Sequence, residues 1–193
     1  PAFAKRAMNM LTADAKEQFT ILKKAATGKD AQVRGAAAAW LGALHTPEAL
    51  ALLTKRAQNE TEATVETQLA LALAANPDVT LAQAAQGLTF NYKKPAATTY
   101  ALALAFMTGN SINALKNALL STDTNQHINA LRSVAYMAEV LSNPDAFAYT
   151  SDRVFDTHLL KGLIAQITAL AKNGSKDEQT YAQNALSQIE KLM

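Results

Sequence analysis

Residues 30–53 read DAQVRGAAAAWLGALHTPEALALL, and this stretch decides the fold because its apolar pattern returns later in the chain. Four of its residues share the spacing of one helix face: Val33, Ala37, Trp40 and Leu41. The same spacing recurs 32 residues later, at Val65, Leu69, Ala72 and Leu73. A helical stripe that returns at a fixed period predicts a stacked array of helix pairs with one continuous core. We expect the side chains of both stripes, Trp40 included, to be buried in that core.

Signals for helix starts and ends divide the rest of the chain. Asp30 is placed to accept hydrogen bonds from the free amides of a first turn, and Pro47 and Pro95 suit first helical positions. Gly42 lies near the end of its helix, where the missing side chain permits a close helix contact. The expected helices cover about 12–26, 30–45, 47–57, 61–75, 81–88, 95–107, 111–120, 125–141, 153–172 and 176–192.

These helices predict about five hairpins in a single domain that covers residues 1–193. The regular repeats extend over about 12–141, and an atypical hairpin over about 153–193 caps the array. Terminal repeats need one solvated face, and the last expected helix is rich in polar residues on all but a narrow stripe.

The composition agrees with an all-α chain and limits its function. Of the 193 residues, 49% are hydrophobic and 18% are charged, and alanine and leucine, both good helix formers, are abundant. A net charge of +2 gives no electrostatic basis for binding nucleic acid. The chain has no cysteine, which excludes disulfides and thiolate zinc sites. No apolar run reaches the roughly 18 residues of a membrane span.

A known repeat shares several features of residues 30–53. The first helix contributes Asp30, Val33, Arg34, Ala37, Ala38, Leu41 and Gly42, and the second contributes Pro47, Glu48, Ala49, Leu50 and Leu53. In these positions the chain resembles the HEAT-like repeat of the phycobilisome-lyase and general HEAT group. The match is specific over 30–53, fair over 59–75, and reduced to a hydrophobic pattern over 77–141. The resemblance implies an all-α, right-handed α–α superhelix, a solenoid that binds partners along an extended surface.

One polar position recurs in four successive inner helices of the expected array, at Arg34, Glu66, Thr99 and Arg132. Tyr100 and Tyr136 lie beside this row or one turn from it. Mixed charge with tyrosines is typical of protein-binding surfaces. We therefore expect these residues to bind a protein or peptide. The alternative is structural: the same positions form ion pairs between neighbouring repeats.

An insertion at 142–152 interrupts the array and contains two aromatic residues, Phe147 and Tyr149. Insertions in repeat arrays often lie on the binding face, which makes both residues further binding candidates. The favoured interpretation is that they fill the space before the last hairpin, because exposing two aromatic side chains is costly.

The remaining polar residues have structural interpretations. His45, His127 and His158 lie far apart without a second ligand at helical spacing, so we expect surface or loop-end histidines rather than zinc ligands. Asp152 and Asp156 near His158 leave a weak cation site as a minor alternative to a first-turn acidic cluster.

A second acidic group, at Glu60, Glu62 and Glu66, surrounds the start of the fourth helix, where the helix dipole and solvent explain it. The chain has no phosphate-binding glycine loop, GxSxG elbow or dinucleotide fingerprint. We expect no catalytic residues, no metal and no cofactor.

These observations predict a non-enzymatic scaffold that binds a protein or peptide on its inner helix face. Two enzyme classes with HEAT-like repeats stay open as alternatives: proteins that excise alkylated bases from DNA, and bilin lyases. The first needs a basic concave face, and the second needs residues for handling a tetrapyrrole. The chain begins at Pro1, so we expect a processed product or part of a longer bacterial protein, and the sequence does not determine its compartment or oligomeric state.

Overall fold

The computed structural model of the chain describes residues 14–76, 79–142 and 158–192. These residues form helices, turns and loops with no β-strand, so the predicted all-α class is confirmed. No helix among them is long and apolar enough to span a membrane. The chain divides into two compact units, Pro1–Asp78 (unit 1) and Val79–Met193 (unit 2).

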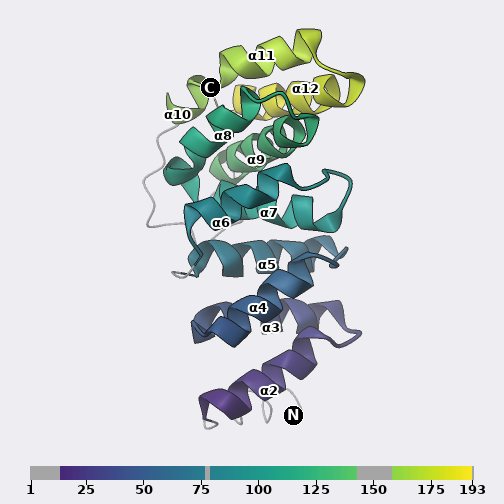
Figure 1. The fold of residues 1–193 in the computed structure, drawn as a ribbon, viewed down its shortest axis with the longest axis vertical. Helices are drawn as coiled ribbons and strands as arrows, with labels where there is room; N and C mark the ends of the chain where they lie inside the picture. The colour runs from purple at the N-terminus through teal and green to yellow at the C-terminus, as the bar shows by residue number, and fades with distance from the viewer. Residues whose placement is uncertain (1–13, 77–78, 143–157, 193) are drawn as a thin grey trace. The chain divides into compact units, whose positions relative to one another are not determined.

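Unit 1 is built around helix α3. Its described helices are α2 (Ala15–Ala26), α3 (Ala31–Leu44), α4 (Pro47–Ala57) and α5 (Ala63–Ala75), and α3 packs against the other three (Figure 1). The Asp30 carboxylate accepts hydrogen bonds from the amides of Gln32 and Val33, at 2.9 and 3.3 Å. Thr46 caps α4, which begins at Pro47. The predicted starts of both helices are confirmed.

The contact between α3 and α5 depends on small residues. A Cβ atom on Gly42 would lie 2.9 Å from the Cβ atom of Ala72, which confirms the predicted close approach at Gly42. Gly35 lies against Gln68 on the same side of α3, about two turns from Gly42. Leu41, Leu69 and Leu73 fill the core around this contact, and all three are fully buried or nearly so.

The predicted burial of Val33 and Trp40 is wrong. Val33 is 38% exposed and Trp40 is 50% exposed. The buried face of α3 consists of Gly35, Ala37, Ala38, Leu41 and Gly42, and is therefore rotated away from the line through Val33 and Trp40. Small side chains let α5 approach this face closely, which leaves the larger indole at its edge.

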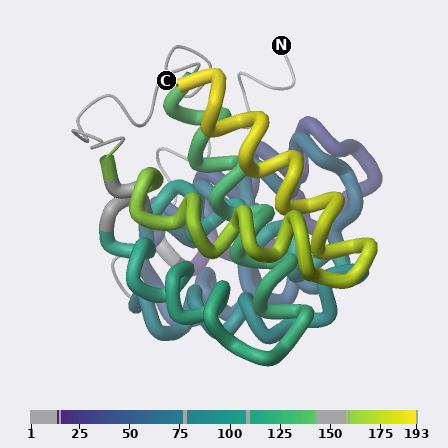
Figure 2. Tube along the Cα trace, turned by 90° about the horizontal axis from the view of Figure 1, so that it is seen from above, coloured from purple at the N-terminus to yellow at the C-terminus, as the bar shows by residue number. Residues whose placement is uncertain are grey.

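Unit 2 is built around the long helix α9 (Thr124–Ser142). The other described elements are α6 (Leu81–Gln86), η1 (Gly87–Thr89), α7 (Pro95–Phe106), η2 (Thr108–Ser111), α8 (Ile112–Leu119), α10 (His158–Lys161), α11 (Ile164–Asn173) and α12 (Lys176–Glu190). Helix α9 packs against α7, α8 and α12, and α11 and α12 lie side by side (Figures 1 and 2).

One predicted helix of unit 2 is divided. The sequence predicts a continuous helix over 153–172, whereas the structure has a turn at Gly162 and Leu163 between α10 and α11. Leu163 is 1% exposed, so the turn places this side chain in the core. Residues 153–157 lie outside the described part of the chain.

The segment before α7 is fixed by a buried asparagine on α9. The side-chain amide of Asn129 donates to the carbonyl oxygens of Leu88 and Phe90, at 3.0 and 2.8 Å. A Cβ atom on Gly87 would overlap the Tyr100 side chain, so η1 and α7 are in direct contact there. These interactions hold the start of α7 against α9.

Candidate functional site

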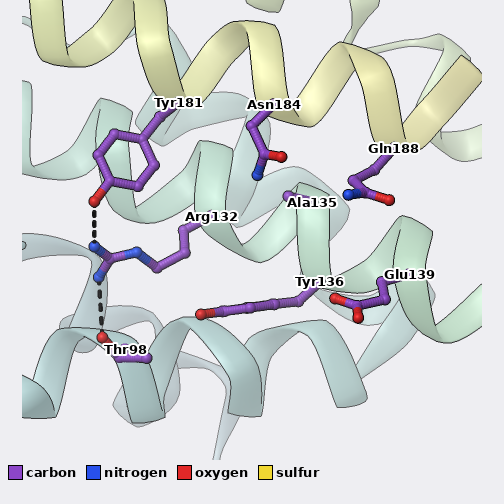
Figure 3. A pocket seen from close by; sticks show the side chains of 8 residues that line it. All are labelled: Thr98, Arg132, Ala135, Tyr136, Glu139, Tyr181, Asn184 and Gln188. Atoms are coloured by element: carbon purple, nitrogen blue, oxygen red, sulfur yellow. Dashed lines mark hydrogen bonds between the residues drawn. The ribbon is translucent and has the colours of Figure 1, made fainter. Parts of the chain in front are cut away.

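A pocket of about 260 Å³ lies in unit 2 between α7, α9 and α12, and is called the α12 pocket below (Figure 3). Helix α7 contributes Thr98, α9 contributes Arg132, Ala135, Tyr136 and Glu139, and α12 contributes Tyr181, Asn184 and Gln188. Seven of the eight lining residues are polar or aromatic. Arg132 belongs to the row of binding residues predicted from the repeat, and Tyr136 is the predicted neighbour one turn from it.

The guanidinium group of Arg132 connects all three helices. Nη1 donates to Thr98 Oγ1 at 3.2 Å and to the carbonyl oxygen of Tyr92 at 3.1 Å. Nη2 donates to the hydroxyl oxygen of Tyr181 at 2.8 Å, and the guanidinium carbon lies 5.0 Å from the centroid of the Tyr181 ring. Each of these partners is neutral. Among the described residues, no carboxylate forms an ion pair with Arg132.

Several contacts fix α12 and thereby the wall of the pocket. Nδ1 of His127 on α9 lies 2.6 Å from Oε1 of Glu178. The hydroxyl group of Tyr92 donates to the Asp177 carboxylate, and this hydrogen bond raises the pKa of Tyr92. The rings of Tyr92 and Tyr181 meet edge to face with their centroids 6.3 Å apart. Helix α12 is thus attached both to α9 and to the segment before α7.

Glu178 has a second role at the start of α12. Its Oε2 atom accepts a hydrogen bond of 2.6 Å from the backbone amide of Ser175, and the Ser175 hydroxyl accepts from the Glu178 amide at 3.4 Å. This reciprocal arrangement is a capping box. Burial alone raises the pKa of Glu178, but the hydrogen bonds from His127 and Ser175 outweigh it and lower the pKa to about 2. The carboxylate is therefore charged at neutral pH.

At the other end of the pocket, two polar side chains have no hydrogen-bond partner among the described residues. The Glu139 carboxylate and the Asn184 amide are both exposed, and neither side chain has a hydrogen-bond partner among the described residues. Asn184 and Gln188 point from α12 toward the side of Tyr136 and Glu139 (Figure 3). An amide side chain both donates and accepts, which matches the donors and acceptors of a peptide backbone.

Arg34, at the equivalent repeat position in unit 1, has a structural role. Its Nε and Nη2 atoms each donate to the Glu60 carboxylate at 3.0 Å, and Arg56 donates to the same carboxylate at 2.7 Å. The Glu60 side chain is 3% exposed, so its predicted placement in solvent is wrong. Burial raises its pKa, and the hydrogen bonds from the two arginines outweigh burial and lower the pKa to about 2. For Arg34, the structure therefore supports the alternative interpretation, a structural ion pair rather than a partner-binding residue.

The other predicted site residues lie apart from the pocket. Thr99 is completely buried on α7, and Tyr100 is buried against Phe90, with ring centroids 5.2 Å apart. Neither side chain offers a surface to a partner. Glu66 is half-buried on α5 in unit 1. The remaining residues considered as site candidates lie outside the described part of the chain, namely Phe147, Tyr149, Asp152 and Asp156.

Sequence reasoning missed the contribution of α12. Tyr181, Asn184 and Gln188 follow one another at three and four residues, the spacing of one helix face. This signal is present in the sequence, but a polar face on a terminal helix is also typical of solvent exposure. His127 is equally unexpected, because its contact with Glu178 joins residues 51 positions apart.

Neither the models of known protein families nor the curated proteins contain a match to this chain. Within the residues that the structure describes, no group of three histidine, aspartate or glutamate side chains is placed to hold a metal ion.

Proposed function

We propose that the chain is a non-enzymatic interaction module that binds a peptide segment of a partner protein in the α12 pocket. The observation that carries this proposal is the position of Arg132. It is a half-buried cation that lines a pocket and has only neutral hydrogen-bond partners in the described structure. Arginine and tyrosine in partly enclosed sites are the residues that most often dominate binding energy.

The size and polarity of the pocket favour a peptide. Its volume of about 260 Å³ lies below the roughly 300–1,000 Å³ of sites for drug-sized molecules. A few residues of an extended chain fit such a site better than a tetrapyrrole. Nucleic acid binding draws its affinity from several phosphate contacts with cations. The pocket is lined by one arginine and one glutamate, which supports neither enzyme alternative.

The proposal includes the finer architecture expected from the sequence, a right-handed HEAT-like superhelix. Two features support it: the repeated apolar stripe, and the packing of α3 on α5 and of α7 on α9 within the two units. In such an array, α3, α5, α7 and α9 are the inner helices. Helix α9 then presents Arg132 and Tyr136 on the binding surface, with α12 as the polar cap beside it.

Selection of peptides from a random display library on the immobilised chain tests this function. We expect the recovered peptides to bind wild type and to lose at least tenfold in affinity on Asn184→Ala and on Arg132→Lys. Asn113→Ala is the matched control, because Asn113 is an exposed asparagine on α8 outside the pocket. Peptides that bind Asn184→Ala and Arg132→Lys as tightly as wild type would contradict the proposal. A selection that recovers no binder would contradict it too.

A further inference from the structure

We propose that the α12 pocket recognises a carboxylate group of the bound segment, held by Arg132 and the hydroxyl group of Tyr181. This inference rests on the proposed peptide-binding function and adds the chemical group that is recognised.

The pocket contains hydrogen-bond donors that have no acceptor among the described residues. A guanidinium group has five N–H donors, and three of them serve Tyr92, Thr98 and Tyr181. The Nε–H group of Arg132 has no acceptor among the described residues. The Tyr181 oxygen accepts from Arg132, so its own hydrogen is available, and no described residue accepts it. Two adjacent residues therefore supply donors beside a positive charge that no described carboxylate neutralises.

Arg132 differs from Arg34, which lies 98 residues earlier at the equivalent repeat position, in the partners of its guanidinium group. In Arg34, Nη1 donates to the backbone carbonyl oxygens of Gly28 and Lys29, and the edge formed by Nε and Nη2 holds a carboxylate, that of Glu60. In Arg132, Nη1 also donates to a backbone carbonyl oxygen, but Nη2 donates to the Tyr181 hydroxyl. A ligand carboxylate that accepts from Nε–H and from the Tyr181 hydroxyl gives Arg132 the anionic partner that Arg34 already has.

The charge of Glu139 favours a carboxylate over a phosphate as the ligand group. The Glu139 carboxylate lines the same pocket, seven residues from Arg132 on α9, which is about 10 Å along the helix axis. A phosphate group carries up to two negative charges near Glu139, whereas a carboxylate carries one. In an extended peptide, about 10 Å corresponds to three residues. A basic residue three positions from the recognised carboxylate would therefore approach Glu139.

The test follows the arginine Nε–H signals in the NMR spectrum of the ¹⁵N-labelled chain. The probes are acetyl-Ala-Glu-Ala-Ala-Lys-Ala-amide, the same peptide with Gln in place of Glu, and acetyl-Ala-Ala-Ala with a free carboxyl end. We expect the Glu peptide to shift the Arg132 signal saturably and to bind at least tenfold more tightly than the Gln peptide. The tripeptide distinguishes a chain-terminal carboxylate from a side-chain carboxylate. The Nε–H group of Arg34 donates to Glu60, so its NMR signal is the internal control and we expect it not to shift.

Two variants keep the test specific. Arg132→Lys removes the assigned signal and identifies it, and Tyr181→Phe retains the ring while removing the hydroxyl group. We expect Tyr181→Phe to lose most of the preference for the Glu peptide over the Gln peptide, with an unchanged circular dichroism spectrum. Inorganic phosphate that shifts the Arg132 signal at lower concentration than either carboxylate would overturn the inference.

The remaining outcomes separate this inference from the function on which it rests. If the Glu and Gln peptides shift the backbone signals of Asn184 and Gln188 equally, peptide binding stands and carboxylate recognition is refuted. If no probe shifts any signal of the pocket, carboxylate recognition is again refuted, and the display selection then decides whether peptide binding itself stands.

Discussion

His127 on α9 and Glu178 on α12 are joined by a contact of 2.6 Å between Nδ1 and Oε1. The Nε2 atom of the same imidazole lies 2.7 Å from the carbonyl oxygen of Ser121. Both ring nitrogens thus face oxygen atoms. Because Glu178 also caps α12, this pair positions the helix that supplies three residues of the pocket.

Acid will destabilise the chain between pH 4.5 and about 2. The pKa of Glu60 and that of Glu178 are each lowered from 4.5 to about 2, since hydrogen bonds to the charged forms outweigh burial. A lowered folded-state pKa means that the stabilisation is complete above pH 4.5 and is lost as the pH falls through 2. Each carboxylate contributes on the order of 3 kcal/mol to the free energy of unfolding at neutral pH. Urea unfolding followed by circular dichroism at a series of pH values measures the loss.

Glu178→Gln provides the control for this pH dependence. The variant will be less stable than wild type at pH 7, and its stability will fall less between pH 4.5 and 2. Glu139→Gln, which replaces an exposed carboxylate without a hydrogen-bond partner in the described structure, will behave as wild type. An equally steep acid loss in Glu178→Gln and wild type would contradict the role of Glu178.

Removing Arg34 will destabilise unit 1 strongly. Arg34→Met leaves the nearly buried Glu60 carboxylate with Arg56 as its remaining arginine partner. Because the carboxylate then stays buried with one partner fewer, the free energy of unfolding in urea will fall. The double variant with Glu60→Met will recover part of this loss, because no unpaired carboxylate then stays buried. Lys23→Met, on the exposed face of α2, is the matched control and will change little.

Two glycines on α3 will respond in opposite directions to alanine. In Gly42→Ala the new Cβ atom lies 2.9 Å from the Ala72 Cβ and 3.1 Å from its Cα, and the α5 backbone must move. We expect a loss of about 1–3 kcal/mol. In Gly35→Ala the nearest atom is Gln68 Cγ at 3.5 Å, an ordinary contact, so the better helix propensity will stabilise the chain by about 0.5–1 kcal/mol. Thermal unfolding measures both variants. Melting temperatures that change in the same direction would contradict the prediction.

The single tryptophan will report an exposed environment. Trp40 is 50% exposed, so iodide will quench its fluorescence in the folded chain to at least half the extent seen in urea. Trp40→Ala will cost about 1 kcal/mol, whereas Phe106→Ala, at a side chain that is 2% exposed, will cost about 3–5 kcal/mol. Strong protection of Trp40 from iodide would show that its side chain is covered in solution.

Part of the candidate site was predictable from the repeat. The row at one repeat position includes Arg132, which lines the pocket, and the neighbouring Tyr136 lines it as well. The same row includes Arg34 and Thr99, which are an ion-pair partner and a buried residue. Repeat equivalence gives a residue's position on its helix, but whether that position faces a cavity or a neighbouring carboxylate depends on the elements packed beside it.

The sequence by itself determined where α3 and α4 begin, because capping residues act within a few positions of one another: Asp30 and Thr46 bond to amides two or three residues away. Only the tertiary structure decided which faces are buried and which polar groups meet. Arg34 reaches Glu60 across 26 residues, and Arg132 reaches Tyr181 across 49. Successive residues of an α-helix are about 100° apart around its axis. A shift of the buried face by one residue therefore changes which side chains meet. The local pattern of α3 does not fix the buried face, because its alanines and glycines fit a helix contact on more than one face.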